Sequence, residues 1–431
     1  MSARDVIPSS LAEHIDRAAQ AVEARVLAWR RDLHQHPELG NREFRTAGIV
    51  AAHLCELGLD DVRTEVAHTG VVGLLKGALP GPTVALRADM DALPVTEQVD
   101  VPFASKVRTQ WNGEEVGVMH ACGHDCHVAI LMGVAEVLSG LRGQLRGTVK
   151  FIFQPAEEGA PECEEGGARM MIQQGALEKP VPQAIFGLHV TSRLPAGIVG
   201  YRPGPTMASS DRFRITVHGK QTHGAAPWLG VDPIVTAAQV VLGLQTVVSR
   251  GVDIAREPAV VTVGMIRGGV RENIIPDEVE MRGTIRAFDE GMRDDIHERV
   301  TTLAEAISRG SRAGCTVCIN KNYPVTVNDP ALTEAMVPTL QRVAGEGRCQ
   351  LVPKVTGAED FSFFQQVIPG LFFFVGVTPE GTDPAKAYSN HSPKFFADER
   401  GLAVGVRALA HLACDFLEST ALAPWGRRDD S

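Results

Sequence analysis

Hydrophobic and polar positions follow the period of helices in some stretches of this chain and the pattern of buried strands in others. Apolar residues recur every three or four positions from Leu11 to Leu33, which predicts an amphipathic helix of several turns. A second helical pattern begins at His124. The apolar runs "TVALRAD", "TVKFIFQ" and "QAIFGLHV" predict buried strands. Buried strands that alternate with helices indicate an α/β sheet covered on both faces.

The pattern changes after about residue 200. Strand, helix, strand, strand, helix and strand follow one another from "DRFRITVHG" to "CTVCINKNY", and this βαββαβ order is that of a ferredoxin-like module. The α/β pattern resumes after about Asn328, with the buried run "LFFFVGV" and a final helix. We therefore expect a mainly parallel-sheet catalytic domain, residues 1–200 and 326–431, interrupted by an inserted lid or dimerisation domain, residues 201–325.

The composition is typical of a globular protein with a large core, since 44% of its 431 residues are apolar and 22% are charged. The net charge of −10 comes without a basic block, so no nucleic acid partner is expected. No apolar run reaches the ~18 residues that span a bilayer, so no membrane partner is expected. The start of the chain lacks the apolar core of a signal peptide, and the eight cysteines are scattered. We therefore expect a cytoplasmic protein with reduced thiols.

The densest group of potential metal ligands is "HACGHDCH", residues 120–127. A structural zinc site would need a second ligand pair of matching spacing, and no other close Cys/His pair supplies one. We therefore expect this cluster to recruit distant residues that follow the predicted strands or lie in a polar turn: Glu157, Glu158, His189 and His391. Ligands collect beyond the carboxyl ends of the strands in such sheets.

Two adjacent carboxylates, Glu157 and Glu158, end an apolar strand. Neighbouring residues in an extended chain point to opposite sides, so one carboxylate can bind metal while the other acts as a general base. In the cluster, the thiolate of Cys122 can bridge two metal ions. His127 lies in the first helical turn, where it can orient a ligand or a carboxylate. Cys126 fits packing in the core, and the role of His120 stays open.

Eight motifs carry a specific resemblance: "RADMDALP", "HACGHDCH", "FQPAEEG", "GLHV", "THGAAPWLGVDPI", "NIIPDEVEMRGTIR", "GAEDFSFF" and "NHSPKF". These motifs follow one another in the same order as in one family, from about residue 24 onward. The chain resembles the hippurate hydrolase, N-acyl-amino-acid amidohydrolase and auxin-conjugate hydrolase family of dinuclear metallohydrolases. The resemblance implies that Cys122 is a bridging ligand and that Glu157 is the general base. The residues that it implies complete the two metal sites are His124, Glu158, His189 and His391.

The same resemblance assigns roles to further residues. The wider superfamily has a histidine ligand two residues before Asp89, where this chain has Arg87. His124 looks like the replacement ligand, which leaves Asp89, like His127, to orient a ligand rather than to bind metal.

The inserted module carries three more positions that match the family. His223 and Asn273 match positions that reach the substrate oxyanion, and Arg286 matches one that grips a substrate carboxylate. An arginine offers a two-pronged donor for a carboxylate, although Arg286 also fits a solvated residue on a strand face.

The resemblance implies a metal-dependent amidohydrolase that cleaves hippurate-like N-acyl amino acids to a carboxylic acid and a free amino acid. Two divalent ions per chain are expected. Zinc and manganese are the first candidates, followed by cobalt and nickel, because mixed nitrogen, oxygen and sulfur donors suit all four. The unpaired sheet edges of the inserted module predict a homodimer or a higher oligomer.

Three alternatives stand beside this hypothesis. One is a metallocarboxypeptidase or dipeptidase that uses the same residues on a peptide bond. Another is a thiol enzyme or redox protein that uses Cys122 or Cys126, which leaves the two glutamates unexplained. The last is a binding protein with a decayed site, and the complete ligand set argues against it.

Overall fold

The chain forms two compact units in the computed structural model, which describes residues 9–419. The second unit is an insertion in the sequence of the first, because the chain leaves the first unit twice and returns to it both times. The first unit comprises Met1–Gly204, Asn328–Pro353 and Phe363–Ser431, and the second comprises Pro205–Val327 and Lys354–Ser362.

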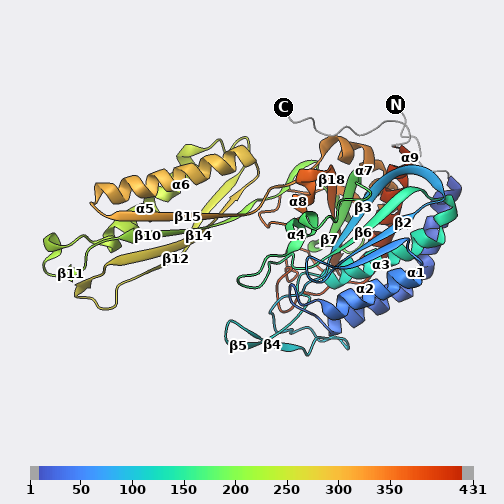
Figure 1. The fold of residues 1–431 in the computed structure, drawn as a ribbon, viewed down its shortest axis with the longest axis horizontal. Coiled ribbons are helices and arrows are strands. Elements are labelled where there is room, and N and C mark those ends of the chain that lie inside the picture. The colour runs from blue at the N-terminus through green and yellow to red at the C-terminus, as the bar shows by residue number, and fades with distance from the viewer. Residues whose placement is uncertain (1–8, 420–431) are drawn as a thin grey trace. The chain divides into compact units, whose positions relative to one another are not determined.

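An eight-stranded sheet forms the centre of the first unit, in the order β1-β2-β6-β3-β7-β18-β8-β17 (Figure 1). Its strands are β1 (Asp61–Val66), β2 (Gly70–Lys76), β3 (Leu79–Asp89), β6 (Arg146–Gln154), β7 (Ala184–Pro195), β8 (Val199–Tyr201), β17 (Cys349–Leu351) and β18 (Gly370–Thr378). The three strands predicted from "TVALRAD", "TVKFIFQ" and "QAIFGLHV" are thus confirmed as β3, β6 and β7.

The expectation of a mainly parallel sheet is confirmed only in part, because the sheet is mixed. Strands β6, β3, β7 and β18 are parallel neighbours, as are β8 and β17. Three neighbouring pairs are antiparallel, namely β1 with β2, β2 with β6, and β8 with β18. Only residues 67–69 separate β1 from β2, and so short a connection forms a hairpin, whose strands must be antiparallel.

Helices cover this sheet and enclose a large apolar core. They are α1 (Ser9–Gln35), α2 (Phe44–Glu56), α3 (His124–Gly140), α4 (Gly167–Gln173), α7 (Pro330–Ala344), α8 (Phe361–Val367) and α9 (Arg400–Ser419). Helix α3 packs against the sheet and against α1 and α9. The predicted apolar stripe of α1 is confirmed, since Leu11 and Leu33 are both buried. A Cβ on Gly133 would lie 2.6 Å from Val26 Cγ2, so any larger residue there would force Val26 or the two helices to shift.

The second unit contains a four-stranded antiparallel sheet in the order β12-β14-β10-β15, with β12 and β15 at its edges. In chain order its main elements are β10 (Ser210–His218), α5 (Pro233–Gly251), β12 (Ala259–Gly268), β14 (Glu278–Ala287), α6 (Glu290–Gly310) and β15 (Gly314–Tyr323). Helices α5 and α6 pack on each other and on the sheet. Buried Asp211 of β10 ties α6 in place, because it accepts hydrogen bonds from Arg293 Nε at 2.8 Å and His297 Nε2 at 2.7 Å.

Short strands complete the fold. They are β4 (Arg108–Trp111), β5 (Glu114–Gly117), β9 (Gly204–Met207), β11 (Thr222–His223), β13 (Ile274–Ile275) and β16 (Thr326–Asn328).

All eight cysteines are free thiols, which confirms the expectation of reduced cysteines. Among residues 9–419, α5 alone has the length and apolar composition of a membrane span, and one such helix is weak evidence for a membrane.

Candidate metal centre

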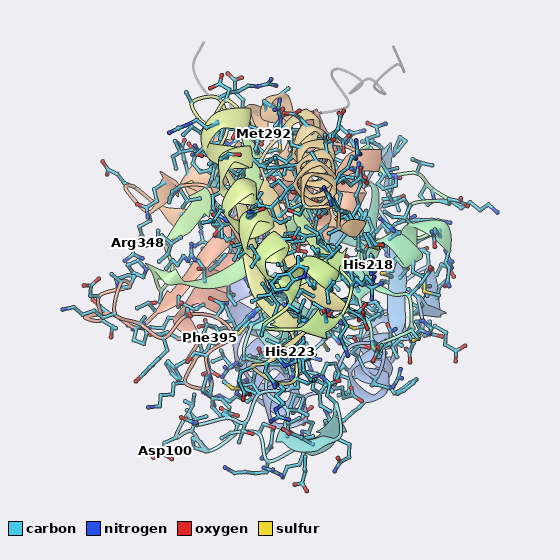
Figure 2. All side chains as sticks on the ribbon, turned by 90° about the vertical axis from the view of Figure 1, so that its left-hand side faces the viewer. Asp100, His218, His223, Met292, Arg348 and Phe395 are labelled. Carbon is cyan, nitrogen blue, oxygen red and sulfur yellow. The ribbon has the colours of Figure 1, made fainter. Side chains whose placement is uncertain are left out.

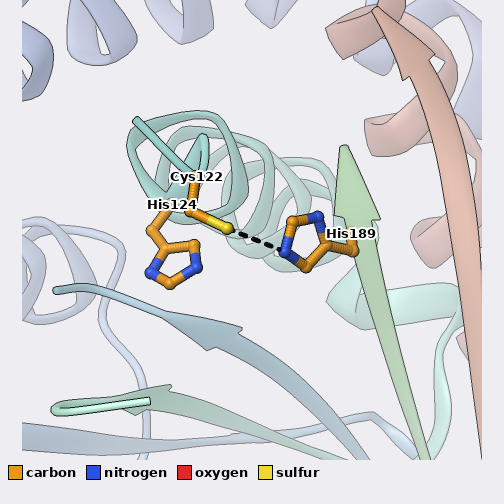
Figure 3. A group of neighbouring side chains, drawn as sticks. All are labelled: Cys122, His124 and His189. Carbon is orange, nitrogen blue, oxygen red and sulfur yellow. Dashed lines mark hydrogen bonds between the residues drawn. The ribbon is translucent and has the colours of Figure 1, made fainter. Parts of the chain in front are cut away.

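Three potential metal ligands meet where α3 begins (Figure 3). Cys122 lies in the loop before α3, His124 is its first residue, and His189 comes from β7. Cys122 Sγ is 3.3 Å from His189 Nε2, and the ligand atoms of all three residues lie within 4.8 Å of one another. The loop depends on Gly123, whose φ is +90° and whose Cβ, if present, would lie 2.4 Å from Val190 Cγ2.

A second group of three ligands shares Cys122 with the first. His391 Nε2 lies 3.2 Å from Cys122 Sγ and 2.9 Å from Glu158 Oε1. The turn that carries His391 is tied to the Cys122 loop, because the His391 N–H donates to Ala121 O at 2.8 Å. Asn390 Nδ2 donates to Cys122 O at 3.0 Å. Cys122 therefore belongs to both groups of potential ligands.

Hydrogen bonds fix the tautomers of two histidines in this centre. His189 Nδ1 donates to Val190 O at 2.7 Å, so its Nε2 presents a lone pair toward Cys122. His127 accepts from the Val190 N–H through Nε2 at 2.8 Å and donates through Nδ1 to Asp89 Oδ1 at 2.5 Å. Both ring nitrogens of His127 thus have hydrogen-bond partners, and this fits a residue that orients other side chains.

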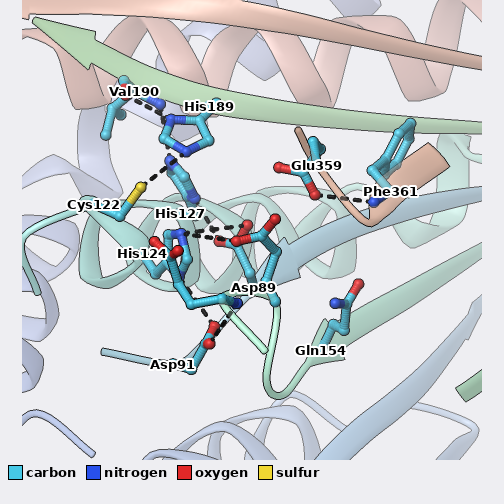
Figure 4. Close-up of polar contacts among 12 residues, drawn as sticks. Asp89, Asp91, Cys122, His124, His127, Gln154, His189, Val190, Glu359 and Phe361 are labelled. Carbon is cyan, nitrogen blue, oxygen red and sulfur yellow. Dashed lines mark hydrogen bonds and ion pairs between the residues drawn. The ribbon is translucent and has the colours of Figure 1, made fainter. Parts of the chain in front are cut away.

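Asp89 is held among positive partners at the end of β3 (Figure 4). Arg87 Nη1 donates to Asp89 Oδ2 at 2.6 Å, and Arg87 Nε donates to Gln154 Oε1 at 2.9 Å. Burial by itself would raise the pKa of Asp89, but His124, Arg87 and His127 hold that pKa well below its usual range. Asp89 therefore stays an anion in a fully buried position.

Asp91 orients two of the candidate ligands, and we did not single it out in the sequence. Its Oδ1 lies 3.1 Å from His124 Nδ1, and its Oδ2 accepts from the Glu158 N–H at 2.9 Å. The bond to Nδ1 leaves His124 Nε2 without a hydrogen bond among residues 9–419. Nε2 lies 3.8 Å from Asp89 Oδ2 and 3.9 Å from Glu157 Oε2. The available signal was the second acidic residue in "RADMDALP".

The two adjacent glutamates lie in a turn after β6 and not in extended chain. Ala156, just before them, has φ of +51°, a left-handed conformation. The ligand atoms of Glu157, Glu158 and His124 lie within 4.8 Å of one another. The expectation that the two carboxylates point to opposite sides is therefore wrong, because a turn does not alternate its side chains as a strand does.

The electrostatics of this pocket fit a divalent cation. Burial, and then the carboxylates of Glu158, Glu157 and Asp89, raise the pKa of the Cys122 thiol well above its usual value. A thiolate is therefore unfavourable here unless a positive charge joins it, and a cation between these donors supplies that charge. The unsatisfied Nε2 of buried His124 is a further donor aimed at the same space.

The raised pKa of Cys122 also bears on the alternative of a thiol enzyme. A nucleophilic cysteine needs a lowered pKa, and burial also raises the pKa of Cys126 above its usual range. Cys126 is fully buried in the main apolar core, where packing accounts for it.

His120 is buried, and neither ring nitrogen makes a hydrogen bond within the described part of the chain. Burial lowers its pKa to about 3.

Two residues expected near the oxyanion lie in the second unit. Both His223, which Figure 2 labels, and Asn273 are exposed. They are neighbours, because β11 pairs with β13 and the Gly224 N–H donates to Asn273 O at 2.8 Å.

Arg286 is half-buried on β14. Its guanidinium makes no hydrogen bond or ion pair among residues 9–419. Burial lowers its pKa, Asp211 opposes that shift, and Arg212 adds to it. An arginine in such surroundings is available to an anionic ligand.

Buried nitrogen, oxygen and sulfur donors at the carboxyl ends of parallel strands, with a carboxylate beside them, define a metal-dependent hydrolase. The model of Peptidase family M20/M25/M40 matches residues 85–415, so the chain belongs to this family. The family resemblance found in the sequence is thereby confirmed.

Known proteins of similar sequence support this assignment. Thermostable carboxypeptidase 2 of Saccharolobus solfataricus is 40% identical over 407 residues, which are 94% of this chain and 99% of that protein. N-acetylcysteine deacetylase of Bacillus subtilis is 39% identical over 402 residues, 93% of this chain and 99% of that protein. The crystal structure of a dinuclear metal-binding M20 peptidase from Bacillus subtilis has a TM-score of 0.78 and 37% identity, covering 93% of this chain and 99% of that one. The chain is therefore a hydrolase of amide or peptide bonds.

Substitution of the two buried cysteines separates a ligand from a packing residue. Cys122→Ala is expected to lower both the cation content and the activity, because it removes the donor common to both ligand groups. Cys126→Ala, the matched control, is expected to keep both. Elemental analysis of the purified variants measures the cation content. Full cation content and activity in both variants would show that the Cys122 thiol is not a ligand. Cys122→Asp, which restores a bridging carboxylate, should have a cation content and an activity between those of the wild type and Cys122→Ala.

Proposed function

We propose that this hydrolase cleaves the amide bond of N-acyl amino acids and releases a carboxylic acid and a free amino acid. The observation that carries the proposal is Cys122, whose Sγ belongs to two groups of potential ligands, one with His124 and His189 and one with Glu158 and His391. This arrangement supports a two-cation centre. The similarity to N-acetylcysteine deacetylase supports an N-acyl amino acid as the substrate.

The proposed chemistry divides between the centre and its surroundings. Two divalent cations held there, zinc or manganese first, would polarise the amide carbonyl and acidify a water. Glu157 takes the proton from the attacking water and delivers it to the leaving nitrogen. Its carboxylate is suited to this because it lies within 4.8 Å of the ligand atoms of His124 and Glu158. His223 and Asn273 donate hydrogen bonds to the developing oxyanion.

A second candidate is a carboxypeptidase or dipeptidase with the same residues, favoured by the similarity to Thermostable carboxypeptidase 2. The two candidates differ in what lies on the acyl side of the scissile bond. A panel of N-acetyl and N-benzoyl amino acids beside peptides with free amino groups distinguishes them, because the proposed enzyme prefers the acylated substrates.

The general base is tested by Glu157→Gln. This variant is expected to keep its cation content and to lose at least ~10²-fold in kcat, the usual scale for a general base. Steady-state kinetics on N-benzoylglycine and elemental analysis provide the two readouts. Glu162→Gln is the matched control, since Glu162 is a nearby exposed glutamate. Turnover close to that of the control would remove Glu157 from the mechanism.

The proposed carboxylate grip is tested by Arg286→Ala. KM for substrates with a free carboxylate should rise, while amidated analogues should change little, because only the former lose a two-pronged ion pair. Arg282→Ala is the matched control on the same strand, where Arg282 is exposed and donates to Glu280 Oε1 at 2.8 Å. An equal loss on both kinds of substrate would contradict the role.

We also propose a two-fold homodimer through the second unit. Edge strand β12 and helix α5 expose large apolar side chains, and monomeric proteins rarely expose a large contiguous apolar patch. They are Ile234, Val235 and Leu242 on α5, Val260 and Ile266 on β12, Trp228 and Leu229 in the short 3-10 helix Pro227–Leu229, and Val270 in a loop. Pairing along an open sheet edge covers such residues and satisfies the edge, and a two-fold dimer is the simplest closed assembly.

In this dimer His223 of one chain serves the active site of the other. Inactive His223→Ala and Glu157→Gln chains are unfolded, mixed and refolded together, with each variant refolded by itself as the control. Up to about a quarter of wild-type activity should return, since random pairing makes half the dimers mixed and each mixed dimer has one intact site of two. Inactive mixed dimers, verified by differential tags, would contradict the exchange.

A further inference from the structure

We propose that Glu43 is a positioning residue, whose buried carboxylate holds the turn with Glu157 and Glu158 in the left-handed form that aims both side chains at the metal centre. This inference rests on the proposed function of those two glutamates. Among residues 9–419, the Glu43 carboxyl group bonds to Ala156 and Thr69 and not to a candidate ligand side chain.

The contacts of Glu43 join three distant segments of the chain. Glu43 is fully buried and immediately precedes α2. Its Oε1 accepts from the Ala156 N–H at 2.9 Å, and its Oε2 accepts from the Thr69 hydroxyl. Ala156 lies 113 positions from Glu43 in the sequence, so this hydrogen bond exists only in the folded chain.

The residue that Glu43 holds is in an uncommon conformation. Ala156 has φ of +51°, and a side chain with a Cβ adopts the left-handed region only against a steric penalty. Such strain persists where the surrounding structure fixes it, and it gathers at functional sites. The hydrogen bond from the buried Ala156 N–H to Glu43 opposes relaxation, because the relaxed turn would leave a buried donor without its partner.

A second carboxylate holds the other end of the same turn. Asp91 Oδ2 accepts from the Glu158 N–H at 2.9 Å. Glu43 and Asp91 are close enough to interact, and burial, followed by the charge of Asp91, raises the pKa of Glu43 to about 8. Two buried acids side by side are unfavourable for stability, so their joint presence at one turn fits a role in orientation.

Loss of the Glu43 acceptor should therefore act on both adjacent glutamates at once. Ala156 relaxes toward negative φ, and the carboxylates of Glu157 and Glu158 move away from His124. Cation affinity then falls through the loss of a ligand, and turnover falls through the loss of the base. A displacement of ~1 Å is enough to lower turnover by about 10²-fold.

The test uses Glu43→Met, which keeps the shape of the side chain and removes both acceptors. Expected are a loss in kcat of about 10²-fold, weaker cation binding, and faster hydrogen exchange in the peptide that spans residues 150–160. Glu43→Gln retains an acceptor for the Ala156 N–H and should stay near wild type. Thr69→Val, the matched control, removes only the other partner of Glu43 and should also stay near wild type. Glu43→Asp, which keeps a carboxyl group but withdraws the acceptor, should follow Glu43→Met and replaces it if that variant does not fold.

A double variant separates positioning from plain stabilisation. Glycine adopts the left-handed conformation without a steric penalty, so Glu43→Met/Ala156→Gly should recover part of the turnover and of the cation affinity lost in Glu43→Met. A residue that only stabilised the fold would give the opposite result, since an added glycine loosens the chain further.

The proposal is overturned if Glu43→Met shows wild-type exchange at this peptide and wild-type cation affinity, or if the added glycine restores neither. Exchange and cation affinity are measured without substrate. A failure of the proposed function, seen as no hydrolysis of N-acyl amino acids by the wild type, therefore leaves this test intact.

Discussion

A buried thiol among carboxylates is a poor place for negative charge, and this constraint governs the metal centre. Cys122 has Glu158, Glu157 and Asp89 around it, and their charges and the burial together disfavour its thiolate. A divalent cation held between these donors would reverse that preference, since it would supply the positive charge that a thiolate needs. The neighbouring residues then hold the side chains around the centre in fixed orientations. Asp91 orients His124, the Val190 carbonyl orients His189, and Asp89 orients His127.

The fold brings the candidate ligands together from four separate stretches of chain. Parallel strands β3, β6 and β7 end at the same edge of the sheet, so the residues that follow them converge. Helix α3 begins at that edge and is buried along most of its length. Helix α3 packs closely against α1, with Gly133 at their contact, and the loop that carries Cys122 leads directly into this buried helix.

Much of this could be predicted from sequence because its signals are local. A buried strand is an apolar run, and a dense cluster such as "HACGHDCH" is visible without a structure. The residues missed were those whose function depends on a long-range contact. Glu43 reads as an ordinary acid beside a helix, and only folding brings it to the Ala156 N–H. The turn at Ala156 was equally invisible, because alanine does not favour a left-handed φ and neighbouring groups impose it.

The central claim is that Cys122 is shared by two cations, and X-ray absorption at the metal edge of the fully loaded enzyme tests it most directly. Two cations per chain are expected, each with one sulfur at ~2.3 Å and with the other cation at about 3.5–4 Å. A Cys122→Asp sample, which has an oxygen donor in place of the sulfur, identifies the source of that sulfur signal. A spectrum of the wild-type protein with no sulfur in the coordination shell, or with no second metal nearby, would contradict the claim.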